Sequence, residues 1–315
     1  MNGRLLSSLA RYPGRGDQRS NCVRRHLLGK RVEMLLQRAV HELQTMLFSR
    51  SEECGFIASC RDRIEIARSY GIYTRLEGAV TSAEGNAPDG MRLWNTPCGS
   101  IWAPLSEKST IVYCIGEQQR GFYGIGKNAV RARDIVLDCG ANFGTFTRRA
   151  LNSGARLVVA IEPAPGTAEC LARTFAGNSC VSVQPVGVWN KNGTQILIQS
   201  SVTSGADSFV LPLDAPQAET AVQVRSIDSI VENLNLSRVD FIKMDIEGAE
   251  CMAIEGARRA LECWKPRLAI CTYHRPDDPR RIAALVRSIR PDYELEYGFR
   301  KNVRGRITPR VAYFR

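Results

Sequence analysis

Three carboxylates lie within six residues of one another in the stretch VDFIKMDIEGAE, residues 239–250. Asp245, Glu247 and Glu250 follow a run of apolar residues that is typical of a buried strand. Like charges this close raise one another's pKa, so the cluster needs a solvated loop or a ligand that uses the charge. The strand end predicts that Asp245 and Glu247 face a cation and an acceptor hydroxyl. Glu250 falls in the first turn of the next helix, where we expect it to interact with the helix dipole.

A histidine follows a second apolar run. His274 comes directly after LAICTY, and the carboxyl ends of parallel strands meet at one edge of a sheet, so we expect His274 to lie across one cleft from Asp245. With an ordinary pKa of about 6.5, a histidine is the natural base for a hydroxyl proton. The sequence therefore predicts His274 as general base, with Asp245 and Glu247 as the other catalytic residues. His26 and His41, in the N-terminal region, are predicted to be surface residues.

A glycine-containing loop, DCGANFG at residues 138–144, follows another apolar run. Gly140 and Gly144 let the backbone turn tightly and approach a ligand, and Thr145 is the expected N-cap of the helix that follows. The unpaired N–H groups of that helix start suit an anionic group of a ligand. The residues predicted to bind a cofactor here are Asp138, Gly140, Asn142, Gly144 and Thr145.

This loop differs from the dinucleotide fingerprint G-x-G-x-x-G, because Asn142 stands at the middle glycine and Asp138 precedes the turn. Asp138 would serve a pyrophosphate badly and a cationic ligand well. The next strand ends at Glu162, about 20 residues on, where an acidic side chain can accept both hydroxyls of a ribose. Together these features predict a nucleoside that carries a charged amino-acid arm, S-adenosylmethionine, with Asp245 close to its methyl group.

The elements that must position these residues alternate along the chain. Apolar runs separated by amphipathic segments indicate a parallel sheet covered by helices on both faces, which is an α/β fold of the Rossmann-like, doubly wound type. The strands are expected at 135–139, 156–162, 181–187, 194–199, 222–226, 239–245 and 267–273, with a terminal strand pair formed by YELEYG and ITPRVAYF. The helices are expected from about 145, at 167–176, at 227–234, from about 248 to 262, and at 278–289.

Three regions are predicted along the chain: a basic, mostly helical N-terminal extension at 1–80, lead-in strands and turns at 81–134, and the Rossmann-like domain at 135–315. Within the extension, residues 27–50 have apolar positions at helical spacing. The net charge of +11 is concentrated in the flanks, with 14 Lys/Arg against 7 Asp/Glu in residues 1–75 and 6 against none in residues 298–315. A solvated surface is the favoured interpretation, and binding of an anionic partner stays open.

Composition is that of an ordinary globular protein, with 44% hydrophobic and 24% charged residues. No apolar run approaches the roughly 18 residues of a membrane span, and the N-terminus lacks a signal peptide's apolar region. The eleven cysteines are scattered and never spaced as C-x-x-C, which argues against a zinc site or a disulfide framework. We therefore expect a reducing, cytoplasmic compartment.

The motifs together resemble one family. VLDCGANFGTFT, VVAIEPAP, RSIDSIVENLNLSRVDFIKMDIEGAE, AIEGARRAL and CTYHRPDD occur in this order, and the sequence is similar to the FkbM family of class I methyltransferases between about residue 110 and residue 298. The resemblance implies a Rossmann-like domain, S-adenosylmethionine as methyl donor, and methylation of a hydroxyl on a natural product, sugar or lipid-like acceptor. The first 75 or so residues and the basic tail fall outside it. The expected enzyme is an S-adenosylmethionine-dependent O-methyltransferase with a small-molecule or glycan acceptor.

Other classes share some of these features. A nicotinamide-dependent oxidoreductase would need the middle glycine, and no Tyr-x-x-x-Lys pair is present. An RNA-modifying methyltransferase, and a non-catalytic module that binds nucleic acid or a membrane surface through the basic flanks, stay open as alternatives.

No metal is expected. Only one or two carboxylates are predicted to reach a common point, Arg275 supplies a cation beside His274, and Asp277 and Asp278 begin the next helix as caps. A metal-assisted mechanism that uses Asp245, Glu247 and His274 stays geometrically open, but the sequence favours a metal-independent reaction.

Overall fold

The computed structural model describes residues 71–83, 90–201, 203–212, 216–303 and 306–315. The predicted helix at 27–50 and most of the predicted extension at 1–80 lie outside these residues. His26 and His41 lie outside them as well.

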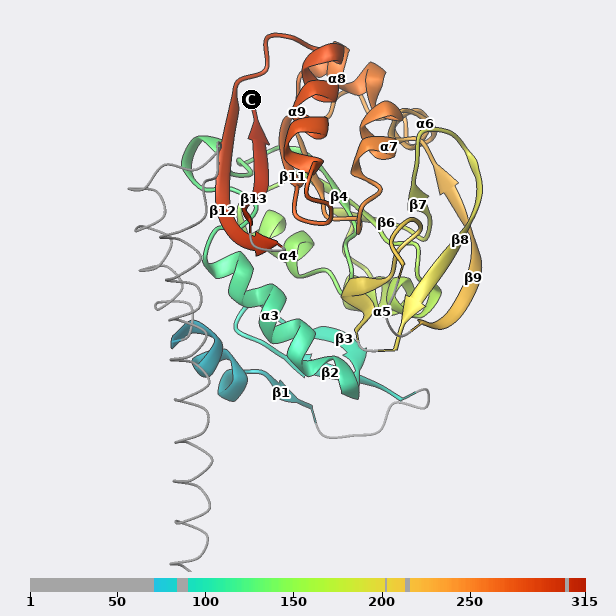
Figure 1. The fold of residues 1–315 in the computed structure, drawn as a ribbon. Helices are drawn as coiled ribbons and strands as arrows, with labels where there is room; N and C mark the ends of the chain where they lie inside the picture. The colour runs from blue at the N-terminus through green and yellow to red at the C-terminus, as the bar shows by residue number, and fades with distance from the viewer. Residues whose placement is uncertain (1–70, 84–89, 202, 213–215, 304–305) are drawn as a thin grey trace, which may run out of the picture. The chain divides into compact units, whose positions relative to one another are not determined.

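The centre of the fold is a seven-stranded sheet (Figure 1). Its order is β12-β13-β11-β10-β4-β5-β6, with parallel pairing from β11 to β6 and antiparallel pairing of β13 with both its neighbours. The strands are β4 (Ile135–Cys139), β5 (Leu157–Ile161), β6 (Val181–Gln184), β10 (Phe241–Met244), β11 (Arg267–Cys271), β12 (Leu295–Val303) and β13 (Arg306–Phe314). The predicted fold class, a Rossmann-like doubly wound α/β sheet, is confirmed.

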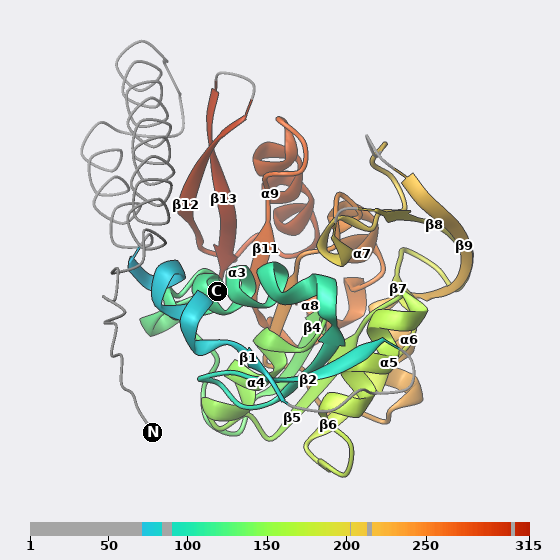
Figure 2. The same ribbon diagram turned by 90° about the horizontal axis from the view of Figure 1, so that it is seen from below.

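Buried side chains on both faces explain why the central strands are apolar throughout. In β4, Leu137 and Cys139 face one hydrophobic cluster and Val136 faces another. The first cluster is covered by α6 (Ile227–Asn233), α7 (Glu250–Glu255), α8 (Arg258–Trp264) and α9 (Asp278–Ile289), and the second by α4 (Thr145–Asn152). Helix α5 (Pro165–Thr174) packs beside α4's side of the sheet (Figure 2). The sheet is therefore sandwiched between helices, which leaves the strand ends as the place for a site.

One predicted helix is wrong as a single element. Residues 248–262 form two helices, α7 and α8, separated at Gly256 and Ala257. A Cβ at Gly256 would lie 2.2 Å from the carbonyl oxygen of Trp189, so the chain turns where the backbone of another segment approaches. The amphipathic pattern continues across the break, which is why the sequence did not reveal it.

Two predicted strands leave the main sheet. β8 (Gly193–Ser200) and β9 (Pro216–Arg225) pair antiparallel with each other, and β7 (Gly187–Val188) joins β9. The predicted strand at 181–187 is correspondingly divided between β6 and β7. This small sheet lies beside the carboxyl ends of the main sheet (Figure 1).

The lead-in region contains an element that the sequence did not predict. After β1 (Thr81–Ser82), β2 (Met91–Asn95) and β3 (Ile101–Pro104), the chain forms a twelve-residue helix, α3 (Lys108–Gln119). Its β-branched residues and its glycine disfavour a helix, and its apolar positions do not form one clear stripe. Tertiary packing decides the structure here, because α3 buries Ile111 and Ile115 in a cluster with Trp94 of β2.

Residues 71–79 are also helical, and Leu76 and Val80 are buried in the same cluster as Trp94. The predicted boundary at residue 80 therefore falls beside a packed core. Among the described residues, no helix combines the length and the apolar character needed to cross a membrane.

Candidate active site

A cavity of about 630 Å³ lies at the carboxyl ends of β4, β5 and β10. This size is typical of a pocket for a nucleoside cofactor or a drug-sized molecule. Its wall is made by α3, the β4–α4 loop, the segment around Thr203–Asp207 and the start of the β10–α7 loop. Of the residues predicted to function, those that line it are Gly140, Asn142, Thr145, Glu162, Asp245 and Glu247.

Gly140 is where the two halves of the site touch. Its φ is +76°, and a Cβ there would lie 2.0 Å from the main-chain oxygen of Asp245. Any other residue would therefore be strained and would collide with the end of β10. The glycine brings the cofactor loop against the end of β10, a contact that the sequence did not predict.

Gly144 and Thr145 form the start of α4 in a different way from the prediction. The N-cap is Gly144, with φ +88°, and Thr145 is the first helical residue, so the assignment of Thr145 as N-cap is wrong. Gly144 does not line the cavity. A Cβ at Gly144 would lie 2.4 Å from the ring of Phe175, so this glycine allows α5's C-terminal end to approach.

Asp138 lies beneath the loop instead of facing the cavity. Its side chain is fully buried, accepts a hydrogen bond from the Thr147 hydroxyl (2.7 Å) and forms an ion pair with Lys243 (Oδ1 to Nζ, 3.2 Å). Lys243 also donates to the carbonyl of Gly140 (2.6 Å). Burial lowers the pKa of Lys243, but the carboxylates of Asp138 and Asp245, with Cys271, together outweigh burial and raise the pKa. The expected direct contact of Asp138 with a cationic ligand is therefore replaced by an internal ion pair that fixes the loop.

Glu162 accepts two backbone hydrogen bonds. Its Oε2 receives the N–H of Asn142 (2.9 Å) and its Oε1 receives the N–H of Ala164 (3.0 Å). Burial raises its pKa to about 7 against the effect of these two donors. Each carboxylate oxygen keeps acceptor capacity toward the cavity that it lines, which fits the hydroxyl pair of a ribose.

The segment around Ser204 covers the loop from the other side. The Asn142 amide donates to the hydroxyl of Ser204 (3.1 Å), and the N–H of Ser204 donates to Glu107 (3.1 Å). Asn142 has φ +49°, which is uncommon outside glycine and is tolerated best by asparagine. The cofactor loop is thus held between β5 and this covering segment.

Asp245 is held by two tyrosines. Tyr123 donates to Oδ2 (2.5 Å) and Tyr273 donates to Oδ1 (3.2 Å). Burial alone raises the pKa of Asp245, but Lys243 and then His274 outweigh it and lower the pKa. The carboxylate is therefore ionised and fixed in orientation at the cavity wall.

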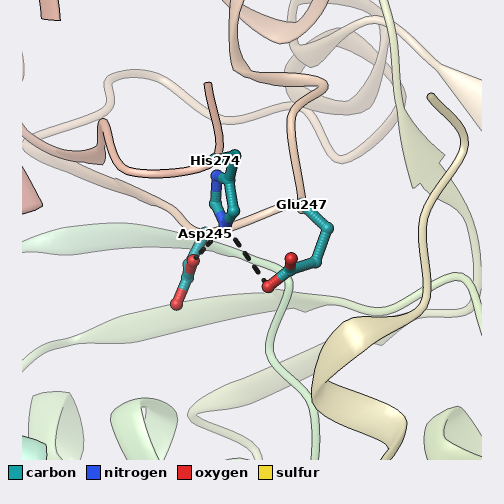
Figure 3. A group of neighbouring side chains, drawn as sticks. All are labelled: Asp245, Glu247 and His274. Carbon is teal, nitrogen blue, oxygen red and sulfur yellow. Dashed lines mark ion pairs between the residues drawn. The ribbon is translucent and has the colours of Figure 1, made fainter. Parts of the chain in front are cut away.

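His274 lies behind the two carboxylates (Figure 3). Its Nε2 is 3.3 Å from Glu247 Oε1 and 3.5 Å from Asp245 Oδ1, and its Nδ1 is 3.1 Å from Glu250 Oε1. The side chain is 2% exposed and does not line the cavity, whereas Glu247 is 22% exposed and does. The structure thus brings His274, Asp245 and Glu247 together. His274 lies behind the carboxylates, however, and not across the cleft from Asp245 as the sequence led us to expect.

The charges around His274 change its expected chemistry. Burial lowers the pKa of its imidazole, but the carboxylates of Glu250 and Glu247 outweigh burial and raise the pKa well above the ordinary value. Glu250 is more than the predicted helix-end charge, because it accepts the N–H of Ile246 (3.1 Å) and also faces the imidazole. The neighbouring carboxylates therefore favour the protonated imidazole, and the role of His274 as general base stays a prediction.

A second charged pair forms the wall opposite the loop. Arg310 of β13 donates to Glu117 of α3 (3.0 Å) and to the hydroxyl of Tyr113 (3.1 Å). Its guanidinium also stacks over the ring of Tyr273, 4.8 Å from the centroid. Tyr113, Glu117 and Tyr273 line the cavity, so this wall presents aromatic rings around one buried carboxylate.

Several residues of the site were not found from the sequence: Glu117, Tyr123, Lys243, Tyr273 and Arg310. Lys243 alone carried a signal, as the single charge inside an apolar strand. Tyr273 directly precedes His274 but was not singled out. Glu117, Tyr123 and Arg310 come from segments that are distant in the chain, and no local spacing marks them.

The sheet order, the glycine loop at the end of β4 and the acidic residue at the end of β5 define a class I methyltransferase architecture. A family model described as the methyltransferase FkbM domain matches residues 138–301, just over half of the chain. The chain belongs to this family. The matched region is therefore a methyltransferase domain, in a family that uses S-adenosylmethionine as methyl donor.

Among solved structures, the chain is similar to methyltransferase FkbM from Methylobacillus flagellatus KT, with 22% identity, 80% of this chain covered and a TM-score of 0.45. It spans 60% of that protein's length. Fibrillarin from Aeropyrum pernix, with natively bound S-adenosyl-L-methionine, matches at 12% identity, with 75% of this chain and 97% of that one covered and a TM-score of 0.39. A putative RNA methyltransferase from Pyrococcus horikoshii matches at 10% identity, with 78% and 94% covered and a TM-score of 0.35. No curated protein matches the sequence.

Proposed function

We propose that this protein transfers the methyl group of S-adenosylmethionine to a hydroxyl oxygen of a small molecule or glycan. The observation that carries the proposal is the placing of Asp245 and Glu247 on the wall of the same cavity as Glu162. A donor held by its ribose at Glu162 would direct its methyl group toward the two carboxylates, where an acceptor hydroxyl can be oriented.

S-adenosylmethionine supplies an electrophilic methyl group on a sulfonium sulfur. In the proposed step the acceptor oxygen forms a bond to the methyl carbon, the carbon–sulfur bond breaks, and its electron pair stays on sulfur. The hydroxyl proton leaves the acceptor. Much of the acceleration in such a transfer comes from holding the two reacting atoms in line at roughly 3–3.5 Å.

The chain's own residues divide this work. Glu162 and the loop from Gly140 to Thr145 hold the donor, and the ion pair between Asp138 and Lys243 fixes that loop from below. We propose that the cluster of Asp245, Glu247 and His274 orients the acceptor hydroxyl and handles its proton. The acceptor meets the two carboxylates first, because His274 lies behind them.

The wall opposite the loop supports a small acceptor. Tyr113 and Tyr273 contribute aromatic rings and Glu117 contributes a carboxylate, a combination suited to the apolar faces and hydroxyls of a sugar or an oxygenated natural product. The basic flanks, in which the sequence left an anionic partner open, contribute no described residue to this wall except Arg310, whose charge is paired with Glu117.

The test is transfer of an isotopically labelled methyl group. Purified protein is incubated with labelled S-adenosylmethionine and a cell extract, and products are identified by mass spectrometry. We expect label on the oxygen of a small molecule or glycan, and less of it with the Glu162→Ala variant at a low donor concentration. Label found in RNA instead would contradict the proposal.

A cytoplasmic location is the remaining part of the proposal. The eight cysteines among the described residues are all free thiols, which supports a reducing compartment. Fractionation of cells that express the protein would test this.

A further inference from the structure

We propose that Asp245, Glu247 and His274 form a binding site for one divalent first-row transition-metal ion, of the Mn²⁺ type, at the carboxylate end of the cavity. The site itself follows from the geometry of the three side chains, and its use in methyl transfer rests on the proposed function. It differs from the metal-independent reaction that the sequence led us to expect.

The three side chains converge on one point (Figure 3). One donor atom from each lies within 4.8 Å of the other two, and the imidazole Nε2 is 3.3 Å from Glu247 and 3.5 Å from Asp245. Two ligand atoms that are each about 2.1 Å from one ion lie about 3.0–3.4 Å apart in octahedral or tetrahedral geometry. The observed separations therefore suit a shared ion.

The imidazole provides an observation independent of the carboxylates. The His274 side chain is 2% exposed, and its ring nitrogens lie 3.1–3.5 Å from three carboxylate oxygens. Within the described part of the chain, neither nitrogen makes a well-formed hydrogen bond with them. A buried polar group of this kind ordinarily has a partner, and an ion between Nε2 and the two carboxylates would provide one.

The residues around His274 and Asp245 are arranged as the residues that orient metal ligands commonly are. A histidine bound to a metal commonly directs its other nitrogen to a carboxylate, and the Nδ1 of His274 faces Glu250, which is itself fixed by the N–H of Ile246. The ligating carboxylate of Asp245 is oriented by the hydroxyls of Tyr123 and Tyr273. These contacts set the direction of two of the three ligands before an ion arrives.

The ligand types indicate which ion fits. Magnesium favours oxygen ligands alone, whereas one imidazole and two carboxylates suit manganese, iron or zinc. Because Asp245 and Glu247 line the cavity, an ion can enter there and keep positions open for an acceptor oxygen. A bound ion lowers the pKa of a hydroxyl that it coordinates, so the proton can leave to solvent through the cavity as the oxygen attacks.

A second group, Glu250, His274 and Asp278, also has donor atoms within reach of one another. It surrounds Nδ1, and neither Glu250 nor Asp278 lines the cavity. Asp278 already accepts the N–H of Arg275 (2.7 Å) and Glu250 that of Ile246, so both carboxylates have structural partners. This second group serves as the comparison in the test.

The test uses the full chain, stripped of metal with EDTA and dialysed. Mn²⁺ is added while the paramagnetic resonance signal of the free ion is recorded. We expect a saturable loss of signal at one ion per chain. Glu247→Gln, which changes a partly exposed side chain, and His274→Ala should each weaken binding by more than about 100-fold, and Glu250→Gln by about 10- to 100-fold, the usual range for a residue behind a ligand.

Asp278→Asn and the exposed Glu255→Gln are the matched controls and should bind Mn²⁺ as the unchanged protein does. No saturable binding, or undiminished binding by Glu247→Gln, would overturn the site. Calorimetry with S-adenosylmethionine on the same stripped protein checks that the cavity is intact. Label transferred to RNA by a protein that still binds Mn²⁺ would count against the proposed function and leave the ion site standing.

Discussion

The two ends of the cavity are built in different ways. The donor end is made largely of main chain: a glycine loop, the start of a helix, and a glutamate that is held by two backbone N–H groups. The carboxylate end is made of side chains, with Asp245 fixed by two tyrosines and His274 placed between three carboxylates.

Because of this difference, we expect one end of the cavity to determine cofactor binding and the other to determine the rate of methyl transfer. A cradle of main chain recognises parts of a cofactor that do not react, and its residues should affect affinity. A cluster of buried charges acts on the reacting atoms, and its residues should affect turnover. Substitutions at the two ends should therefore change different kinetic quantities.

The largest effect is expected at the carboxylate end. His274→Ala removes a side chain that contacts both Asp245 and Glu247, so turnover should fall by roughly 10²- to 10⁴-fold, the span that follows loss of a group that handles the acceptor's proton. Affinity for S-adenosylmethionine, measured by calorimetry, should stay within about twofold because His274 does not line the cavity. A comparable loss of donor affinity would remove the distinction between the two ends.

The donor end should respond in the opposite manner. Glu162→Ala should weaken S-adenosylmethionine binding by about 1.5–3 kcal/mol, the usual scale for hydrogen bonds to a charged group. Glu169→Ala is the control, since Glu169 is an exposed glutamate that pairs with Arg173 on the surface of α5. Equal donor affinity in the two variants would mean that Glu162 does not hold the ribose.

Substitution of Gly140 tests the close approach between the β4–α4 loop and the end of β10, which joins the two ends of the cavity. Gly140→Ala puts a Cβ at φ +76° and 2.0 Å from the main-chain oxygen of Asp245, so the free energy of unfolding should fall by about 1–3 kcal/mol. Gly166 of α5 has nothing within 4 Å of such a Cβ, and Gly166→Ala should leave stability unchanged or raise it by up to about 1 kcal/mol. Urea unfolding of both variants measures the difference, and equal midpoints would show that the close approach is not needed.

The smallest effect is a pH dependence of donor binding. Burial raises the pKa of Glu162 from 4.5 to about 7, so its contribution to folding stability is fully present below pH 4.5 and is lost as pH rises through 7. Ribose hydroxyls bind the ionised form, so donor affinity should increase by up to about tenfold between pH 6 and pH 8. Calorimetry should show a flat profile for Glu162→Gln, and a flat profile for the unchanged protein would contradict the assignment.

The donor end could largely be predicted because its chemistry is local. The glycines follow an apolar run directly, and Glu162 lies at the end of the next strand, so spacing alone places them together. The contacts of Asp138 could not be predicted from spacing in this way. The register of β4 against β10 sets Lys243 opposite Asp138, and no sequence pattern specifies that register.

The carboxylate end was predicted only in part. Asp245, Glu247 and His274 each stand at a strand end, which the alternation of elements revealed. Tyr123 and Glu117 were missed because their helix and loop are decided by tertiary packing, and the sequence indicated only strands and turns in that region. A histidine can act as a general base, remain protonated or bind a metal ion, depending on its neighbours. For His274 these neighbours include Glu250, and only the fold sets the orientation of the Glu250 carboxylate.

The ion pair between Arg310 and Glu117 also has a consequence for the order in which the site forms. The two residues are 193 positions apart, whereas Asn142 and Glu162, which hold each other at the donor end, are 20 apart. At about 5–20 residues per second of synthesis, Arg310 is made roughly 10–40 s after Glu117. The donor cradle can therefore assemble while the chain is still growing. Glu117 lacks this partner until β13 enters the sheet, so the wall that we propose for the acceptor is completed after the donor cradle.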